Sequence, residues 1–329
     1  MTGSPLVTIA VPTFNRATML ERCLESALGQ SYAAVEVIVC DNASTDSTED
    51  VVTRALAGHP RARYVRHDTN LGAVANFQAG LDLATGDYFM WLADDDWLDP
   101  DYVARCVEVL RDDPRVVLAN GDAVYYTTGH PPVTDEGVSL TQASATRRVL
   151  GYYAWVIRNA AFYGLSTTEA RRAVTLDDAL ACDWVHVAEL AALGTIRRVP
   201  ATIHRLNAGA STTVEMSLAG VTQPIAKLVA ADVRRAVAFS HLSAAERSAL
   251  AFACAGIVYW RYGVLHLRDR LVGRLTHKLK SRLSVEDYQR LRRAYHRLAR
   301  HHAPSTDRAT LPGCPRDDRG ASGEIGNPG

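Results

Sequence analysis

Short apolar runs alternate with helix-like segments through the first 120 residues, and this alternation is the feature that most limits the fold. Runs rich in β-branched and aromatic residues stand at 6–11, 35–40, 63–66, 88–93 and 116–119. Between them, apolar residues recur with helical spacing. Strands joined by helices through short connections form a mostly parallel sheet with helices on both faces. We therefore predict an α/β fold with a Rossmann-like sheet.

Polar clusters follow three of the expected strands directly, at 13–16, 41–46 and 94–96. The carboxyl ends of parallel strands meet at one edge of a sheet, where ligands bind. The third cluster is three adjacent aspartates, which repel one another unless a positive charge compensates them. A divalent cation with phosphate oxygens is the simplest candidate, and a solvated acidic turn before the next helix is the alternative. Because all three polar clusters are expected at the same edge, we favour a binding site over a solvated acidic turn.

Composition excludes several classes of protein. The chain of 329 residues contains 36 Lys+Arg and 36 Asp+Glu, so its net charge indicates no nucleic-acid partner. Its six cysteines include no CxxC pair and suggest buried thiols in a reducing compartment. The beginning of the sequence does not resemble a secretory signal, and the apolar stretch 249–267 is interrupted by charge. We expect a cytoplasmic protein.

The pattern is looser beyond residue 125. We expect the following elements: a long loop at 127–148, a strand at 161–168, an apolar helix at 179–193, a strand at 195–203 and a polar loop at 207–213. Helix formers dominate from 218 to 302, and a tail rich in Pro, Gly and Ser follows.

Five motifs in order carry a family resemblance: Val-Pro-Thr-Phe-Asn-Arg at 11–16, Cys-Asp-Asn-Ala-Ser-Thr-Asp at 40–46, Asn-Leu-Gly at 70–72, Ala-Thr-Gly-Asp-Tyr at 84–88 and Leu-Ala-Asp-Asp-Asp-Trp at 92–97. Together they resemble the family 2 glycosyltransferases, which have the GT-A fold. The resemblance is strong over 5–125 and loose over 160–213. It implies a nucleoside-diphosphate sugar donor (UDP, dTDP or GDP), Mg²⁺ or Mn²⁺, a hydroxyl acceptor and inversion at the anomeric carbon.

The resemblance also assigns roles to individual residues. It implies that the donor is bound by Pro12, Thr13, Asn15, Arg16, Asp41, Asn70 and Asp94, with Asp41 hydrogen-bonding the base. It makes Asp95 the direct metal ligand, with Asp96 and His204 as further candidates and Arg205 as a possible phosphate partner. Many relatives have an acidic residue at the position of Ala93. Here the triplet starts one residue later, so the division of roles among its members stays open.

The acceptor hydroxyl must lose a proton to a base, which relatives place at the start of a helix after the sheet. Asp183, followed by Trp184, is our candidate, with Asp177 and Asp178 in reserve. The alternative makes Asp183 a helix N-cap. Trp184 could offer a face to an acceptor sugar or pack in the core.

We expect the chain to have four parts. The resemblance implies a nucleotide-sugar-binding half at 1–125 and an acceptor-binding and catalytic half at 126–217, and composition indicates a helical C-terminal extension at 218–303 and a disordered tail at 304–329. The segment 261–302 carries twelve Lys/Arg against three Asp/Glu, interleaved with leucines. It is either a solvated helical hairpin or a peripheral contact with the anionic inner face of a membrane.

Two other classes compete with a glycosyltransferase. Sugar nucleotidyltransferases have a similar sheet but need a Gly-rich basic loop after the first strand, and 11–16 is not such a loop. A non-catalytic relative that binds nucleotide sugars or carbohydrate is the second alternative, and the intact acidic triplet argues against it.

Overall fold

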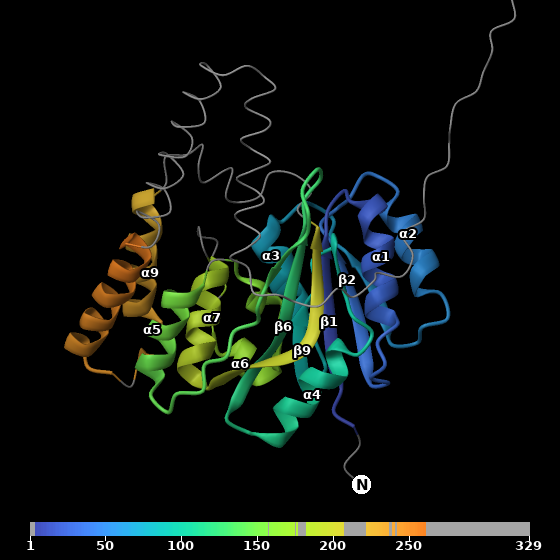
Figure 1. Cartoon of the computed structure of the whole chain (residues 1–329). Coiled ribbons are helices and arrows are strands. Elements are labelled where there is room, and N and C mark those ends of the chain that lie inside the picture. Colours follow the sequence, from blue (N-terminus) through green and yellow to red (C-terminus); the bar gives the residue numbers. More distant parts are fainter. Residues whose placement is uncertain are drawn as a thin grey trace, which may run out of the picture. The chain divides into compact units, whose positions relative to one another are not determined.

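A computed structural model describes residues 4–156, 158–174, 176, 182–206, 222–236, 239–240 and 242–260. The chain divides into two units, 1–266 and 267–329, and all the described residues belong to the first. Figure 1 shows its sheet between two sets of helices.

The first part of the chain alternates strands and helices as predicted: β1 (Val7–Thr13), α1 (Ala17–Leu28), β2 (Val35–Asp41), α2 (Thr48–Leu56), β3 (Ala62–Arg66), α3 (Ala73–Leu83) and β4 (Tyr88–Trp91). The four strands are parallel and stand in the order β3-β2-β1-β4. The loops that follow β1, β2 and β4 therefore share one edge, which we call the carboxyl edge.

The second part adds strands of both directions: β5 (Asp96–Leu98), α4 (Tyr102–Asp112), β6 (Val116–Tyr126), β7 (Val133–Asp135), α5 (Ala145–Trp155), a 3-10 turn η1 (Ala160–Tyr163), β8 (Leu165–Thr167), α6 (Thr168–Arg172), α7 (Cys182–Leu193) and β9 (Thr195–Leu206). β8 runs antiparallel between β4 and β6, β9 runs parallel to β6, and β5 pairs antiparallel with β9. The predicted α/β fold with helices around a mostly parallel sheet is confirmed.

Three local expectations differ from the structure. The strand expected at 161–168 is a 3-10 turn, Ala160–Tyr163, followed by the short strand β8, Leu165–Thr167. The segment 127–148, expected to be one long loop, contains β7 and the start of α5, whose N-cap Ser144 accepts a hydrogen bond from the Arg147 N–H. The acidic triplet is not wholly a loop, because Asp96 begins β5. Both strands are only three residues long: β5 pairs with the distant β9 and β7 forms a hairpin with β6, so little local periodicity marks them.

The core lies on both faces of the sheet. Along β1, Val7, Ile9 and Val11 pack in one cluster with α1, α2 and α4, while Ala10 belongs to a second cluster with α3, α5 and α7. This alternation is the period of two that a strand imposes when both faces are covered. The buried thiols of the first part, Cys23, Cys40 and Cys106, lie within this core, as expected.

Part of the predicted C-terminal extension packs on the second face. α9 (Thr222–Arg235) and a helix at 244–260 contribute apolar side chains to the cluster that contains α5 and α7. No helix among the described residues combines the length and hydropathy that crossing a bilayer requires. The basic segment 261–302, the loop 207–213 and the tail 304–329 lie outside the described residues, and the predicted domain boundaries stay a prediction.

Phe239→Ala tests whether the extension belongs to the catalytic core. Phe239 is 1% exposed in the cluster shared with α5 and α7, so its removal should lower the free energy of unfolding by about 3–5 kcal/mol. Phe252→Ala is the matched control, because Phe252 is 78% exposed. Equal denaturant midpoints for the two variants would show that the extension folds separately from the core.

Candidate active site

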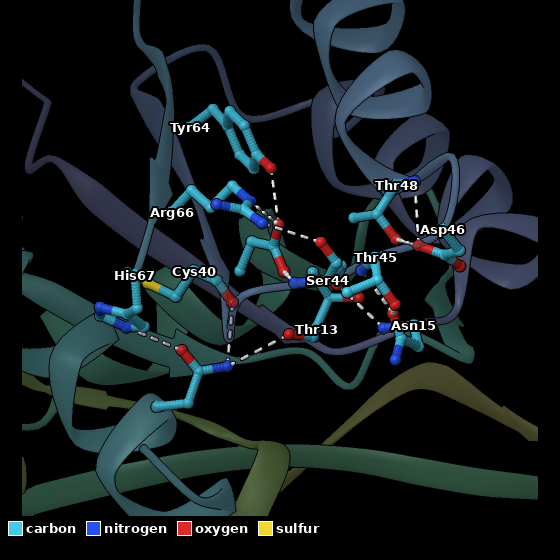
Figure 2. A network of polar contacts seen from close by, with 12 residues as sticks. Thr13, Asn15, Cys40, Ser44, Thr45, Asp46, Thr48, Tyr64, Arg66 and His67 are labelled. Carbon is cyan, nitrogen blue, oxygen red and sulfur yellow. Dashed lines mark hydrogen bonds and ion pairs between the residues drawn. The ribbon is translucent and has the colours of Figure 1, made fainter. Parts of the chain in front are cut away.

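Asn15 joins the loop after β1 to the loop after β2. Its φ of 53° lies in the left-handed region, which asparagine tolerates better than most residues. Asn15 Oδ1 accepts from the Thr45 N–H at 2.8 Å, and the Asn15 N–H donates to Ser44 Oγ at 2.9 Å (Figure 2). The side chain of Asn15 is exposed at the carboxyl edge, whereas Pro12 is buried within β1 opposite Cys40.

Asp41 ends β2 and is fully buried. Asp41 Oδ1 accepts from the Ser44 N–H at 2.9 Å, and Oδ2 accepts from the Tyr64 hydroxyl at 2.6 Å. Arg66 Nε lies 3.5 Å from the same Oδ2, and Figure 2 shows Tyr64 and Arg66 reaching this point from β3. A nucleobase would have to displace one of these partners, so the geometry favours a structural role. Base binding by Asp41 stays a prediction.

Asn70 closes the Asn-Leu-Gly turn against the loop after β2. Its Oδ1 accepts from Asn42 Nδ2 at 2.7 Å and from the Gly72 N–H at 2.9 Å. The Leu71 N–H in turn donates to Asn42 Oδ1 at 2.8 Å. These bonds hold Asn70, which is exposed, at the carboxyl edge, where it could contact a nucleotide.

Asp94 and Asp95 face the loop after β1. Thr13 Oγ1 donates to Asp94 Oδ2 at 2.8 Å. Arg16 Nη1 donates to Asp95 Oδ2 at 2.6 Å and lies 3.5 Å from Asp94 Oδ1. Burial raises the pKa of Asp94 to about 6, against the lowering effects of Arg16 and Thr13. The structure thus brings Thr13, Arg16 and two members of the triplet together.

Asp96 faces β9 instead. Its Oδ2 accepts from Arg205 Nε at 2.8 Å and its Oδ1 from the Leu206 N–H at 3.3 Å. Burial raises the pKa of Asp96 to about 6, although the Arg205 charge opposes this. The side chain of Asp96 is 1% exposed, against 10% for Asp94 and 17% for Asp95. Of the three, Asp95 is the most accessible to a cation and Asp96 the least.

His204 lies on β9 beside Trp97, with the two rings parallel and their centres 5.1 Å apart. Its Nε2 is 2.9 Å from Asp99 Oδ1, and its Nδ1 is 3.0 Å from the Tyr126 hydroxyl. An incoming metal ion would have to break one of these hydrogen bonds. They count against metal binding by His204, which stays a prediction.

Asp183 lies half-buried in the first turn of α7. Asn159 Nδ2 donates to Asp183 Oδ2 at 3.1 Å, and the Tyr152 hydroxyl donates to Asn159 Oδ1 at 2.8 Å. Burial raises the pKa of Asp183, while the Asn159 hydrogen bond and the Arg205 charge lower it. A carboxylate with a raised pKa takes up a proton more readily, as a general base must.

Trp184, the residue after Asp183, belongs to the core. It is buried in the cluster on the second face of the sheet, so it packs α7 and offers no face to a sugar. The reserve candidates Asp177 and Asp178 lie outside the described residues. Sequence reasoning missed Asn159, because its contact with Asp183 spans 24 residues and belongs to no local motif.

Arg205 links the triplet to Asp183 electrostatically. Its guanidinium pairs with Asp96, and its charge acts on the pKa of Asp183. The guanidinium carbon also lies 4.2 Å from the centre of the Tyr163 ring. Arg205 is therefore engaged within the protein, which does not favour its expected role as a phosphate partner.

Asp94 and Asp95 together fit a divalent cation. One positively charged group, Arg16 Nη1, already contacts one oxygen of each carboxylate. Within the described ranges, no three His, Cys, Asp or Glu side chains gather into a complete metal site. Mg²⁺ commonly takes one or two protein carboxylates and completes its shell with substrate phosphates and water. The donor set suits a cation shared with a diphosphate.

This mostly parallel sheet with helices on both faces is the architecture of the GT-A fold. Solved structures of similar fold include S. aureus TarS 1–349 in complex with UDP-GlcNAc (TM-score 0.57, 15% identity, 75% of this chain and 70% of that chain). Another is the mannosyltransferase PcManGT from Pyrobaculum calidifontis in complex with GDP-Man and Mn²⁺ (TM-score 0.51, 20% identity, 92% of this chain and 82% of that chain). At these identities the likeness concerns the fold alone.

The sequence comparison finds the same resemblance. Residues 8–160, a little under half of the chain, match the model of Glycosyl transferase family 2. The chondroitin synthase of Escherichia coli is 37% identical over 110 residues, which are 33% of this chain and 16% of the synthase. The chain thus spans a small part of the length of this relative.

Proposed function

We propose that this protein is an inverting, metal-dependent glycosyltransferase that moves a sugar from a nucleoside-diphosphate donor to a hydroxyl acceptor. The observation that carries the proposal is the pair Asp94 and Asp95, which faces a cationic group at the carboxyl edge of a GT-A sheet. Asp183, with its raised pKa, supplies a separate carboxylate for proton transfer.

The loops of the carboxyl edge bind the donor. Thr13, Asn15 and Asn70 line the nucleotide pocket, and Asp41 supports it by fixing Ser44 and the loop after β2. Asp94 and Asp95 hold Mg²⁺ or Mn²⁺, which supplies positive charge to stabilise the diphosphate leaving group. Arg16 contributes a second positive charge to the same region.

Asp183 removes the acceptor proton. The acceptor oxygen attacks the anomeric carbon from the face opposite the diphosphate, and its proton passes to a carboxylate oxygen of Asp183. As the new C–O bond forms, the bond to the phosphate oxygen breaks and its electron pair leaves with the nucleoside diphosphate. One displacement inverts the anomeric carbon. Asn159 orients the carboxylate through Oδ2.

The candidate donors are UDP, dTDP and GDP sugars, since similar folds are known with UDP-GlcNAc and with GDP-Man. The acceptor is a hydroxyl of a polysaccharide, glycolipid or natural product. Release of nucleoside diphosphate from these donors, measured with Mn²⁺ and with chelator, tests the proposal. If the protein binds a donor but releases no nucleoside diphosphate with a broad set of acceptors, the result would support a non-catalytic relative. Release of pyrophosphate would instead support a nucleotidyltransferase.

We also propose a cytoplasmic location with peripheral membrane contact through 261–302, on the strength of its twelve basic residues. The full chain should co-sediment with vesicles rich in anionic phospholipid at low salt, and salt near 0.5 M should release it. Neutral vesicles are the control. Absence of co-sedimentation at low salt would contradict the membrane contact.

A further inference from the structure

Arg16 places its positive charge between the two carboxylates that are proposed to hold the metal ion. Its Nη1 lies 2.6 Å from Asp95 Oδ2 and 3.5 Å from Asp94 Oδ1. The Arg16 side chain is 45% exposed, whereas its backbone carbonyl accepts from the Leu20 N–H in the first turn of α1. The helix thus holds the backbone of Arg16, while its side chain is accessible from solvent.

We propose that Arg16 is an exchangeable counter-ion, which neutralises Asp94 and Asp95 in the donor-free protein and is displaced when the metal ion and the donor diphosphate bind. This inference rests on the proposed function. The released guanidinium then pairs with the diphosphate, because a planar guanidinium can donate two parallel N–H groups to phosphate oxygens.

Three physical arguments support the exchange. Asp94 is buried, and a buried carboxylate without a positive partner is costly, so the donor-free protein needs a cation here. A divalent ion and a guanidinium repel each other at about 4 Å, so both cannot stay between the same carboxylates. Finally, the Arg16 side chain is 45% exposed, so a diphosphate can reach its guanidinium from solvent, while the incoming metal ion replaces the positive charge beside Asp94 and Asp95.

The exchange makes metal and donor binding cooperative. A metal ion alone must displace Arg16 without offering it a new partner. The nucleoside diphosphate provides that partner, so each ligand should strengthen the binding of the other by the same factor.

Titration of the full chain with Mn²⁺, followed by electron paramagnetic resonance of the free ion, tests this directly. In the absence of nucleotide, Arg16→Gln should bind Mn²⁺ about tenfold more tightly than the wild type, because the competing charge is gone. Added UDP or GDP should improve Mn²⁺ affinity less in this variant than in the wild type. Arg22→Gln is the matched control: Arg22 lies on the same helix, but its guanidinium stacks on Trp97.

A double variant shows where the ion binds. Asp95→Asn combined with Arg16→Gln should lose the gain in Mn²⁺ affinity, because the ion then lacks its carboxylate ligand. Equal or weaker Mn²⁺ binding in Arg16→Gln than in the wild type would overturn the exchange. Turnover of the wild type with nucleotide sugars is scored separately, so the proposed function can stand when the exchange fails.

Discussion

Asp183→Asn should lower turnover by about 10²- to 10⁴-fold while donor and Mn²⁺ affinity stay close to wild type. Asparagine keeps the size of the side chain and caps helices about as well as aspartate, but it cannot take a proton. The proposed donor contacts lie on Thr13, Asn15 and Arg16, whose hydrogen bonds involve residues other than Asp183. Release of nucleoside diphosphate at saturating substrates gives the rate, and calorimetry gives the affinities.

Asp50→Asn is the control for a loss of negative charge at a helix N-terminus, since Asp50 lies exposed in the first turn of α2. It should leave turnover unchanged. Near-normal turnover in Asp183→Asn would remove Asp183 as the base and direct attention to Asp177 and Asp178.

The pH profile gives this prediction a second readout. The ionised carboxylate of Asp183 is the active form, and burial raises its pKa. As the pH is lowered, activity should therefore begin to fall at a pH above the ordinary aspartate value of about 4. Asn159 lowers that pKa by donating to the charged form, so Asn159→Ala should shift the acidic limb of kcat/KM to higher pH. If Asn159 had a purely structural role, Asn159→Ala would lower kcat/KM without shifting the acidic limb of its pH profile.

Asp95→Ala should abolish metal-dependent donor binding and lower turnover by at least about 10²-fold, because the diphosphate loses its cation. The fold should survive, since Asp95 is the most exposed member of the triplet and its partner Arg16 is itself exposed. Calorimetric titration of donor with and without Mn²⁺ measures the loss, and thermal unfolding checks the fold.

Asp96→Ala provides the contrast within the same triplet. It leaves the Arg205 guanidinium without its carboxylate partner, so the main effect should be a lower Tm. If Asp96→Ala abolished metal binding while Asp95→Ala retained metal-dependent turnover, the roles that we assign to these two residues would be reversed.

Much of the fold could be predicted because the first half of the chain encodes it locally. Periods of two and 3.6 in the apolar residues placed β1 to β4 and the helices between them, and parallel order followed from short connections. In the second half, β5 and β7 are three residues each and exist through pairing, β5 with the distant β9 and β7 with β6 in a hairpin. Segments that short carry too little periodicity to be recognised.

The sequence by itself determined which residues stand at the carboxyl edge, since the loops after β1, β2 and β4 must meet there. Only the tertiary structure decided what each carboxylate contacts. Asp94 and Asp95 face Arg16, whereas Asp96 pairs with Arg205, 109 residues away. Asp41 is covered by Tyr64, and Asp183 is held by Asn159. Asp94 and Asp95 lie in the turn before β5, whereas Asp96 begins β5 and pairs with β9, so neighbours in sequence acquire different partners that no local pattern encodes.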